Sequence, residues 1–241
     1  MIWYVDQKAA VNGDGSAEHP FKKIQQAAEK AQAGDEVLVE PGIYREEVSP
    51  VYAGTKEKPI VYRSRMPRQA VISGAERFDN WEKVSSDVWK LAVPNIYFGS
   101  CNPYTTLVWG DWLSPTFPCH TGEVYLNGKS LYEKETLEEV MNPVIDDTSW
   151  DKDFTLHTWY TCQDDTRDET ILYANFQGAD PNIEQAEINV RPHCFYPAME
   201  HVDYITLTGF TVTMAATQWA PPTALQEGMI GPHWSKGWVI D

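Results

Sequence analysis

Short runs of β-branched and aromatic residues recur near the start of the chain at a spacing that few folds produce. Ile60 follows Val37 by 23 positions, and turn formers such as Pro41-Gly42 fill the gap. Strands that return at roughly 20 to 30 residues are typical of a parallel β-solenoid, in which each coil buries its inward face only against its neighbours. The runs are Glu36–Val39, Ile43–Tyr44, Ile60–Tyr62 and Val71–Ile72.

A cap precedes these strands. After a short strand at Trp3–Asp6 and a turn at Asn12–Gly15, Pro20 suits the first position of a helix, and Gly34 lies just past its expected end. Such a helix would cover the first strand edge, which otherwise invites aggregation. Its apolar face would consist of Phe21, Ile24, Ala27, Ala28 and Ala31.

The pattern changes between about Trp81 and Asn182, where the strands are longer and more aromatic. Alternation around turns such as Asn127-Gly128 favours the antiparallel strands of a small β-sandwich. A helical stretch is expected at Thr136–Val140. The expected strands are Val88–Leu91, Leu107–Trp109, Val124–Leu126, Phe154–Leu156 to Trp159-Tyr160, and Ile171–Tyr173.

Short runs like those of the first segment then return, and the sequence predicts an all-β chain in which a solenoid is interrupted by an inserted domain. The expected parts are residues 1–80 (cap and first rungs), 81–182 (insert) and 183–241 (returning rungs). With no closing helix after Trp238–Ile240, we expect the chain to be the N-terminal part of a longer protein. An uncovered last strand would let copies associate, which leaves a homo-oligomer open. The returning runs are Ala186–Val190, Tyr204–Leu207, Phe210–Thr213 and Gly237–Ile240.

Composition excludes several classes of protein. The chain has 19 Lys and Arg against 35 Asp and Glu, and its net charge of −16 would repel a nucleic acid. Mean hydropathy is −0.44, and no run approaches the ~20 apolar residues of a membrane span. No secretory signal opens the chain, and its four Cys form no CxxC pair, so we expect reduced thiols and a cytoplasmic protein. Ten Trp and twelve Tyr would offer stacking surfaces to sugar rings.

Two sets of motifs resemble known proteins. The stretch His19 through Asp35, followed by Glu40–Glu46, resembles the opening of right-handed parallel β-helix proteins. A more specific set resembles the β-xylosidases of glycoside hydrolase family 120 across nearly the whole chain. That set is Asn102-Pro103-Tyr104, Gly110–Leu113, Ala174–Asn182, Trp219–Thr223, Ile230–Pro232 and Trp234–Trp238.

The resemblance implies a right-handed parallel β-helix with an inserted β-sandwich, and a retaining, exo-acting β-xylosidase that cleaves xylobiose and short xylo-oligosaccharides. Such enzymes use two carboxylates about 5 to 5.5 Å apart, one as nucleophile and one as acid and base. In the family these residues lie on later rungs, which would follow Asp241. No residue of this chain matches either carboxylate, so the chain alone is expected to be inactive.

The residues expected to bind substrate are Trp112, Asp111, Trp219, His233 and Trp234. Trp112 matches a family Trp that reaches over the sugar site, and Asp111 could accept hydroxyl hydrogen bonds. Trp219, His233 and Trp234 lie on long excursions between rungs, where functional loops are common. No cofactor or metal is expected, because the His residues lack ligand spacing and Asp164–Glu169 is better explained as a charged loop than as a calcium site.

Two alternatives remain open. A polysaccharide lyase, which would use calcium to neutralise uronate carboxylates, can also be built on a parallel β-helix, but its polyanionic substrate fits poorly with a net charge of −16. A noncatalytic carbohydrate-binding module would bind xylo-oligosaccharides without turnover.

Overall fold

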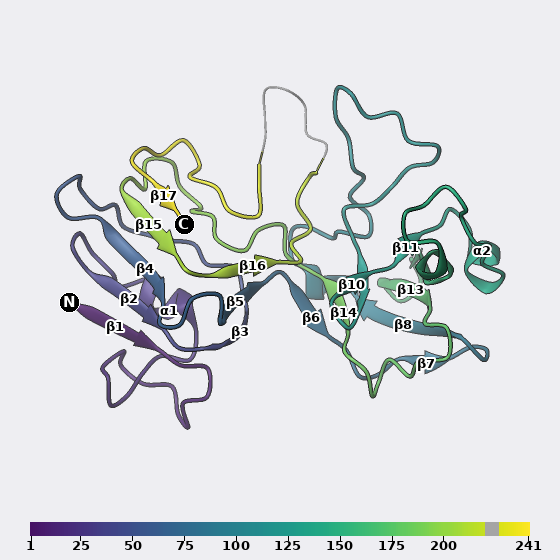
Figure 1. The fold of residues 1–241 in the computed structure, drawn as a ribbon, viewed down its shortest axis with the longest axis horizontal. Coiled ribbons are helices and arrows are strands. Elements are labelled where there is room, and N and C mark those ends of the chain that lie inside the picture. Colours follow the sequence, from purple (N-terminus) through teal and green to yellow (C-terminus); the bar gives the residue numbers. More distant parts are fainter. Residues whose placement is uncertain (220–226) are drawn as a thin grey trace. The chain divides into compact units, whose positions relative to one another are not determined.

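A computed structural model describes residues 1–219 and 227–241, which form two compact units. The first unit comprises Met1–Gly74, Arg191–Thr217 and Glu227–Asp241. The second comprises Ala75–Val190 together with Gln218 and Trp219. Strands dominate both units, as an all-β chain requires (Figure 1). Among the described residues, no helix is long and apolar enough to cross a membrane.

The first unit is built from two parallel sheets. One has the order β1-β2-β4-β15-β17 and the other β16-β5-β3, and every pairing in both is parallel. In Figure 1 the first of these sheets can be followed from the N-terminal β1 through β2 and β4 to β15. Their bounds are β1 Ile2–Val5, β2 Glu36–Val39, β3 Gly42–Arg45, β4 Ile60–Ser64, β5 Ala70–Ser73, β15 Ile205–Thr208, β16 Thr211–Thr213 and β17 Val239–Ile240.

The register of these strands stacks inward side chains directly above one another. Val37 lies opposite Tyr62, Tyr62 opposite Leu207, and Leu207 opposite Ile240. The first three are almost fully buried, whereas Ile240 is 54% exposed. Each strand therefore buries its apolar face against the next strand in the stack, as the sequence spacing predicted.

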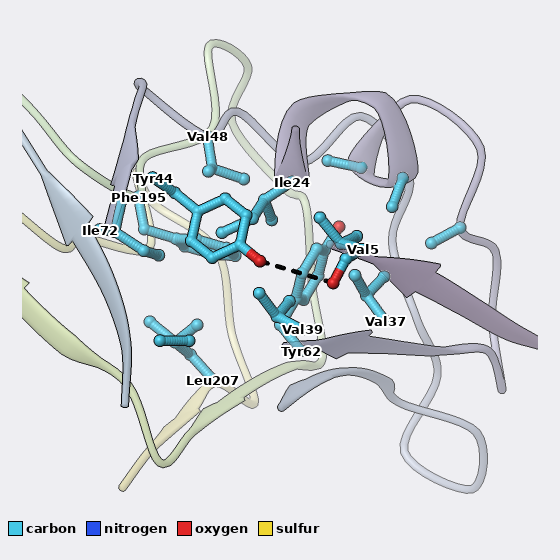
Figure 2. Close-up of a cluster of buried hydrophobic side chains, with 14 of the residues drawn as sticks. Val5, Ile24, Val37, Val39, Tyr44, Val48, Tyr62, Ile72, Phe195 and Leu207 are labelled. Atoms are coloured by element: carbon cyan, nitrogen blue, oxygen red, sulfur yellow. Dashed lines mark hydrogen bonds between the residues drawn. The ribbon is translucent and has the colours of Figure 1, made fainter. Parts of the chain in front are cut away.

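The core of the first unit gathers side chains from both sheets and from α1 (Ile24–Ala28) (Figure 2). Phe195 packs edge-on against Tyr62 with ring centroids 5.0 Å apart. The Tyr44 hydroxyl lies 2.9 Å from the Glu40 carbonyl and 3.5 Å from the Val5 carbonyl, so the one proton of this polar group has an acceptor inside the apolar cluster.

The capping helix is shorter than the sequence predicted. Phe21 forms a parallel bridge to Val5, exchanging backbone hydrogen bonds with Tyr4 and Asp6 on either side. Those bonds hold Phe21 in extended conformation, so the helix begins at Ile24 rather than at Pro20. The predicted inward face is confirmed, because Phe21, Ile24, Ala27, Ala28 and Ala31 are all buried.

The second unit contains two further sheets. One has the order β11-β12-β13-β8-β7, antiparallel except for β11 with β12, and the other is the antiparallel sheet β10-β9-β14-β6. Leu91, Leu172, Val124 and Ile188, two from each sheet, share one buried cluster. The bounds are β6 Ala75–Arg77, β7 Glu82–Lys83, β8 Val88–Pro94, β9 Val124–Leu126, β10 Lys129–Ser130, β11 Tyr132–Glu133, β12 Thr158–Asp164, β13 Glu169–Asn175 and β14 Ala186–Asn189, with helices η1 Asn95–Phe98, α2 Leu137–Met141 and η2 Lys152–Leu156.

The Asn-Gly turn and the short helix of this unit agree with the sequence. Asn127 and Gly128 have φ of 52° and 81° between β9 and β10, the conformation of a two-residue hairpin turn. The Thr136 hydroxyl accepts from the Glu139 amide and caps α2.

Three strand predictions in this region are wrong. Ala186–Asn189, expected to be a returning parallel rung, pairs antiparallel with β9 and β6 in the second unit, so the second unit runs from Ala75 to Val190 instead of from 81 to 182. Phe154–Leu156 lies in η2, where Phe154 stacks on His157 with ring centroids 4.1 Å apart. Leu107–Trp109 forms only an isolated antiparallel bridge between Leu107 and His120.

Candidate functional site

Asp111 and Trp112 lie on a loop of the second unit whose base is closed by backbone hydrogen bonds. The Val108 amide donates to the Cys119 carbonyl at 2.8 Å, and the Thr121 amide donates to the Thr106 carbonyl at 2.9 Å. These bonds flank the Leu107–His120 bridge and fix both ends of the loop. The loop therefore projects from an anchored base.

A buried tyrosine supports that base. The Tyr104 hydroxyl donates to the Glu123 carbonyl at 2.8 Å and lies 3.2 Å from the Asn189 carbonyl. Burial raises the pKa of Tyr104 well above its usual value, so the group stays a neutral donor. Gly122 lies against the ring of Tyr104, where an added Cβ would come within 2.5 Å of the ring. The segment that precedes the loop is thus held to Glu123, directly before β9, and to β14.

Trp112 presents its ring to solvent. The residue is 66% exposed, and Asp111 beside it is also exposed. Trp109 on the same loop is 54% exposed, and the side chain of Gln218 holds that part of the loop, accepting from the Trp109 amide and donating to the Leu107 carbonyl. The ring face of Trp112 is accessible for stacking on an apolar sugar face.

His233 and Trp234 belong to the first unit, whereas Asp111 and Trp112 belong to the second. The His233 Nδ1 lies 2.8 Å from the Pro197 carbonyl, and its ring lies beside Tyr196 with centroids 5.2 Å apart. Trp234 is 71% exposed. Protein contacts therefore fix His233 in place, whereas Trp234 is accessible to a ligand.

Trp219 is 54% exposed and lines a cavity of about 550 Å³ within the second unit. The other sequence-predicted site residues do not line it. The other residues of the Trp219–Thr223 motif, Ala220 to Thr223, lie outside the described part of the chain.

The cavity contains polar and aromatic residues that the sequence analysis did not single out. His120 Nδ1 lies 2.5 Å from Glu133 Oε1, and Trp150, also in the lining, is 92% exposed. The one sequence feature that could have indicated this cavity is Trp150, a tryptophan within the polar run Asp146–Lys152. Within residues 1–219 and 227–241, no three His, Cys, Asp or Glu side chains gather as metal ligands would.

The free thiols agree with the sequence interpretation. Cys101, Cys119, Cys162 and Cys194 are all unpaired by disulfides. Asp164 to Asp168 form a turn between β12 and β13, in which the Asp164 carboxylate accepts from the Thr166 amide at 3.0 Å.

Comparison with known proteins finds similarity in the second unit and across the whole chain. Residues 78–188 match the glycoside hydrolase 120 insertion domain. A solved structure described as the complex of XylC with xylose is 44% identical over 100% of this chain, with a TM-score of 0.94. The resemblance to family 120 that the motifs indicated is confirmed.

The matched relatives are longer proteins. The chain spans 40% of XylC. It is also 37% identical over 71 residues to the uncharacterized protein YwoF of Bacillus subtilis (strain 168), a match that covers 30% of this chain and 15% of YwoF.

Proposed function

We propose that this chain is the N-terminal part of a retaining, exo-acting β-xylosidase that releases xylose from xylobiose and short xylo-oligosaccharides. The observation that carries the proposal is the 44% identity to XylC, a protein solved with xylose, over the full length of this chain. Since the chain spans 40% of XylC, a longer parent protein is the natural context for this activity.

The proposed architecture is a right-handed parallel β-helix with an inserted antiparallel β-sandwich. Support comes from two stacked parallel sheets in the first unit and from a third line of parallel bridges, Val48 to Phe195 and Phe195 to Ile230. Three parallel faces around one core are what a β-helix coil provides. The sandwich is supported by the two sheets of the second unit that share one buried cluster.

The proposed chemistry divides between this chain and residues beyond it. A nucleophilic Asp and an acid and base Glu, on later rungs that follow Asp241, would cleave the glycosidic bond through a covalent intermediate. This chain would contribute binding surface: Trp112 would stack on a pyranose face, and Asp111 would accept a sugar hydroxyl hydrogen bond. The anchored base of the loop would hold the Trp112 ring in place.

The first test is whether the native reading frame continues past the codon for Asp241. Further β-rungs that carry an Asp and a Glu on neighbouring rungs would support the proposal and name the carboxylates to mutate. A stop codon there would contradict it and favour a noncatalytic carbohydrate-binding module.

The second test replaces Trp112 by alanine in the 241-residue chain and in the longer parent. Because Trp112 is 66% exposed, we expect less than about 0.5 kcal/mol of lost stability but at least about tenfold weaker binding of xylobiose. Steady-state hydrolysis of an aryl β-xyloside by the parent, with Ile96→Ala as the matched exposed control, measures the effect on KM and kcat. Unchanged kinetics in Trp112→Ala would remove this residue from the site, and turnover by the 241-residue chain at roughly 1 per second or more would contradict its proposed inactivity.

A further inference from the structure

The second unit contains a cavity of about 550 Å³ that combines aromatic rings with hydrogen-bonding groups. Its volume lies in the range of about 300 to 1,000 Å³ that is typical of small-ligand sites. The lining comes from β10, β11, η2 and the segments around Cys119 and Trp150, so residues far apart in the sequence converge on it.

Trp150 stands at this cavity with its ring uncovered while its neighbours are fixed. It is 92% exposed. On one side, the Ser149 amide donates to the Asp146 carbonyl at 3.2 Å, and the Ser149 hydroxyl lies 3.3 Å from the Tyr132 hydroxyl. On the other side, Asp151 forms an ion pair with Lys129. An anchored but exposed indole adds little to the core and offers a flat face for stacking.

The inner part of the cavity is also aromatic. Trp159 is 1% exposed, and Phe154 is half-buried beneath Lys129, whose Nζ lies 3.8 Å from the Phe154 ring centroid. The same ammonium lies 6.0 Å from the centroid of the Trp150 ring. Lys129 therefore bridges the two rings and the Asp151 carboxylate, and it holds one wall of the cavity together.

The carboxylates of the lining already have protein partners. Glu133 accepts from the His120 amide at 3.0 Å and from His120 Nδ1 at 2.5 Å, while Glu123 accepts from the Ser130 hydroxyl at 2.6 Å. With Asp151 paired to Lys129, each of these three lining carboxylates has a hydrogen-bond donor or an ion-pair partner within the protein. Each carboxylate oxygen still has a lone pair for a further donor. When His120 is neutral, its donation from Nδ1 leaves Nε2 as an acceptor.

This combination selects for a neutral ligand rich in hydroxyl groups. An anion would meet three carboxylates, and a metal ion would meet carboxylates already bound to donors. We propose that the cavity binds a pyranose unit of a neutral saccharide, with one sugar face stacked on Trp150 and its hydroxyls donating to Glu133 and Glu123. Trp112 does not line this cavity, so the proposed site is additional to the one built on Trp112.

The test follows tryptophan indole signals in the 241-residue chain labelled with ¹⁵N-tryptophan, which gives ten such signals. Xylose, xylobiose, glucose and cellobiose are titrated separately, and Trp150→Ala assigns the Trp150 signal. The choice of xylose and xylobiose rests on the proposed function. The choice of glucose and cellobiose does not. Ile183→Ala, which removes a side chain 77% exposed in the same unit, is the matched control, and Glu133→Gln keeps the side-chain shape while removing its charge.

We expect at least one of these sugars to shift the Trp150 signal saturably. Its dissociation constant, followed in Trp150→Ala from the signal of Trp159, which also lines the cavity, should rise at least about tenfold in that variant and several-fold in Glu133→Gln. It should stay unchanged in Ile183→Ala and Trp112→Ala. Binding of glucosides but not xylosides at Trp150 would support this site while counting against the proposed xylosidase. Binding that survives Trp150→Ala, or no shift of the Trp150 signal at about 50 mM of every sugar, would overturn the site, even if Trp112-dependent xyloside binding persists.

Discussion

Replacement of Glu46 by alanine should loosen the capping helix α1 of the first unit. Glu46 is 7% exposed, and its two carboxylate oxygens accept from the Ile24 amide at 2.8 Å and from the Gln25 amide at 3.0 Å. These are first-turn amides that have no partner within the helix. Glu46 thus caps α1 from 22 positions further along the chain.

The magnitude follows from the burial of the two amides. Leaving the buried Ile24 N–H unpaired costs about 1 to 3 kcal/mol, and the Gln25 N–H, which reaches solvent, adds less. Removing a buried charge offsets part of this cost, because burial raises the pKa of the Glu46 carboxyl. We expect a net loss of about 2 kcal/mol, which corresponds to roughly 30-fold faster exchange of protected amides.

Hydrogen exchange measured by mass spectrometry on peptides spanning residues 21–45 gives a local value for this change. Glu47→Ala is the matched control: the Glu47 side chain is 37% exposed, and its Oε1 lies 3.7 Å from His193 Nδ1, so its loss should cost under about 1 kcal/mol. Exchange in Glu46→Ala within about threefold of the native rate, or equal acceleration in Glu47→Ala, would refute the capping argument.

The pH dependence of this segment has a defined sign. Because the folded pKa of Glu46 lies above its ordinary value of 4.5, the folded state binds the proton more tightly than the unfolded state. This contribution to stability is fully present below about pH 4.5 and is lost as the pH rises through the folded pKa. Glu46→Gln should remove the contribution of Glu46 to the change of the unfolding free energy with pH. If that pH dependence is the same in the variant, another group causes it.

Three further outcomes can be checked separately. Burial raises the pKa of Cys194 to about 12, so iodoacetamide at pH 8 should label Cys194 only after unfolding while the half-buried Cys101 reacts in the native chain; native labelling of Cys194, detected by peptide mass, would contradict its burial. Tyr104→Phe removes the hydroxyl that lies against the carbonyls of Glu123, next to β9, and Asn189 of β14, and should cost about 1 to 2 kcal/mol, measured by hydrogen exchange of residues 121–130. Gly128→Ala should cost about 1 to 2 kcal/mol through strain at φ 81° alone, since open space surrounds the added Cβ, and a larger loss in urea denaturation would show a steric clash instead.

The parallel strands of the first unit were predictable because local signals agree there. Val37, Ile60 and Val71 each sit in an apolar run bounded by turn formers, and all lie in strands. The sequence was a poorer guide to the direction in which a strand pairs and to the strand it pairs with. Ala186–Asn189 carries the same local pattern as a solenoid rung, but its partners Val124 and Glu76 lie more than 60 positions away in the sequence, and a short run contains no signal for them.

The predicted start of the capping helix was wrong for a similar reason. Proline at position 20 permits a helix, yet the hydrogen bonds of Phe21 to Tyr4 and Asp6 outweigh that local preference. For the site, the loop motif singled out Trp112, and the structure adds that its ring is exposed. The cavity at Trp150 could not be predicted, because His120, Glu133 and Trp150 converge only once the strand register is set.

The tryptophans divide into a buried set and an exposed set. Trp81, Trp89 and Trp159 are buried in the core of the second unit, whereas Trp109, Trp112, Trp150, Trp219 and Trp234 are each more than half exposed. Exposed indoles contribute little to folding and lower solubility, so packing does not explain them. Four of these five belong to the second unit, in which residues 78–188 match the glycoside hydrolase 120 insertion domain. If the second unit contributes the aromatic surface that holds a saccharide, it needs accessible indole rings. The chain combines such a unit with a unit of stacked parallel strands.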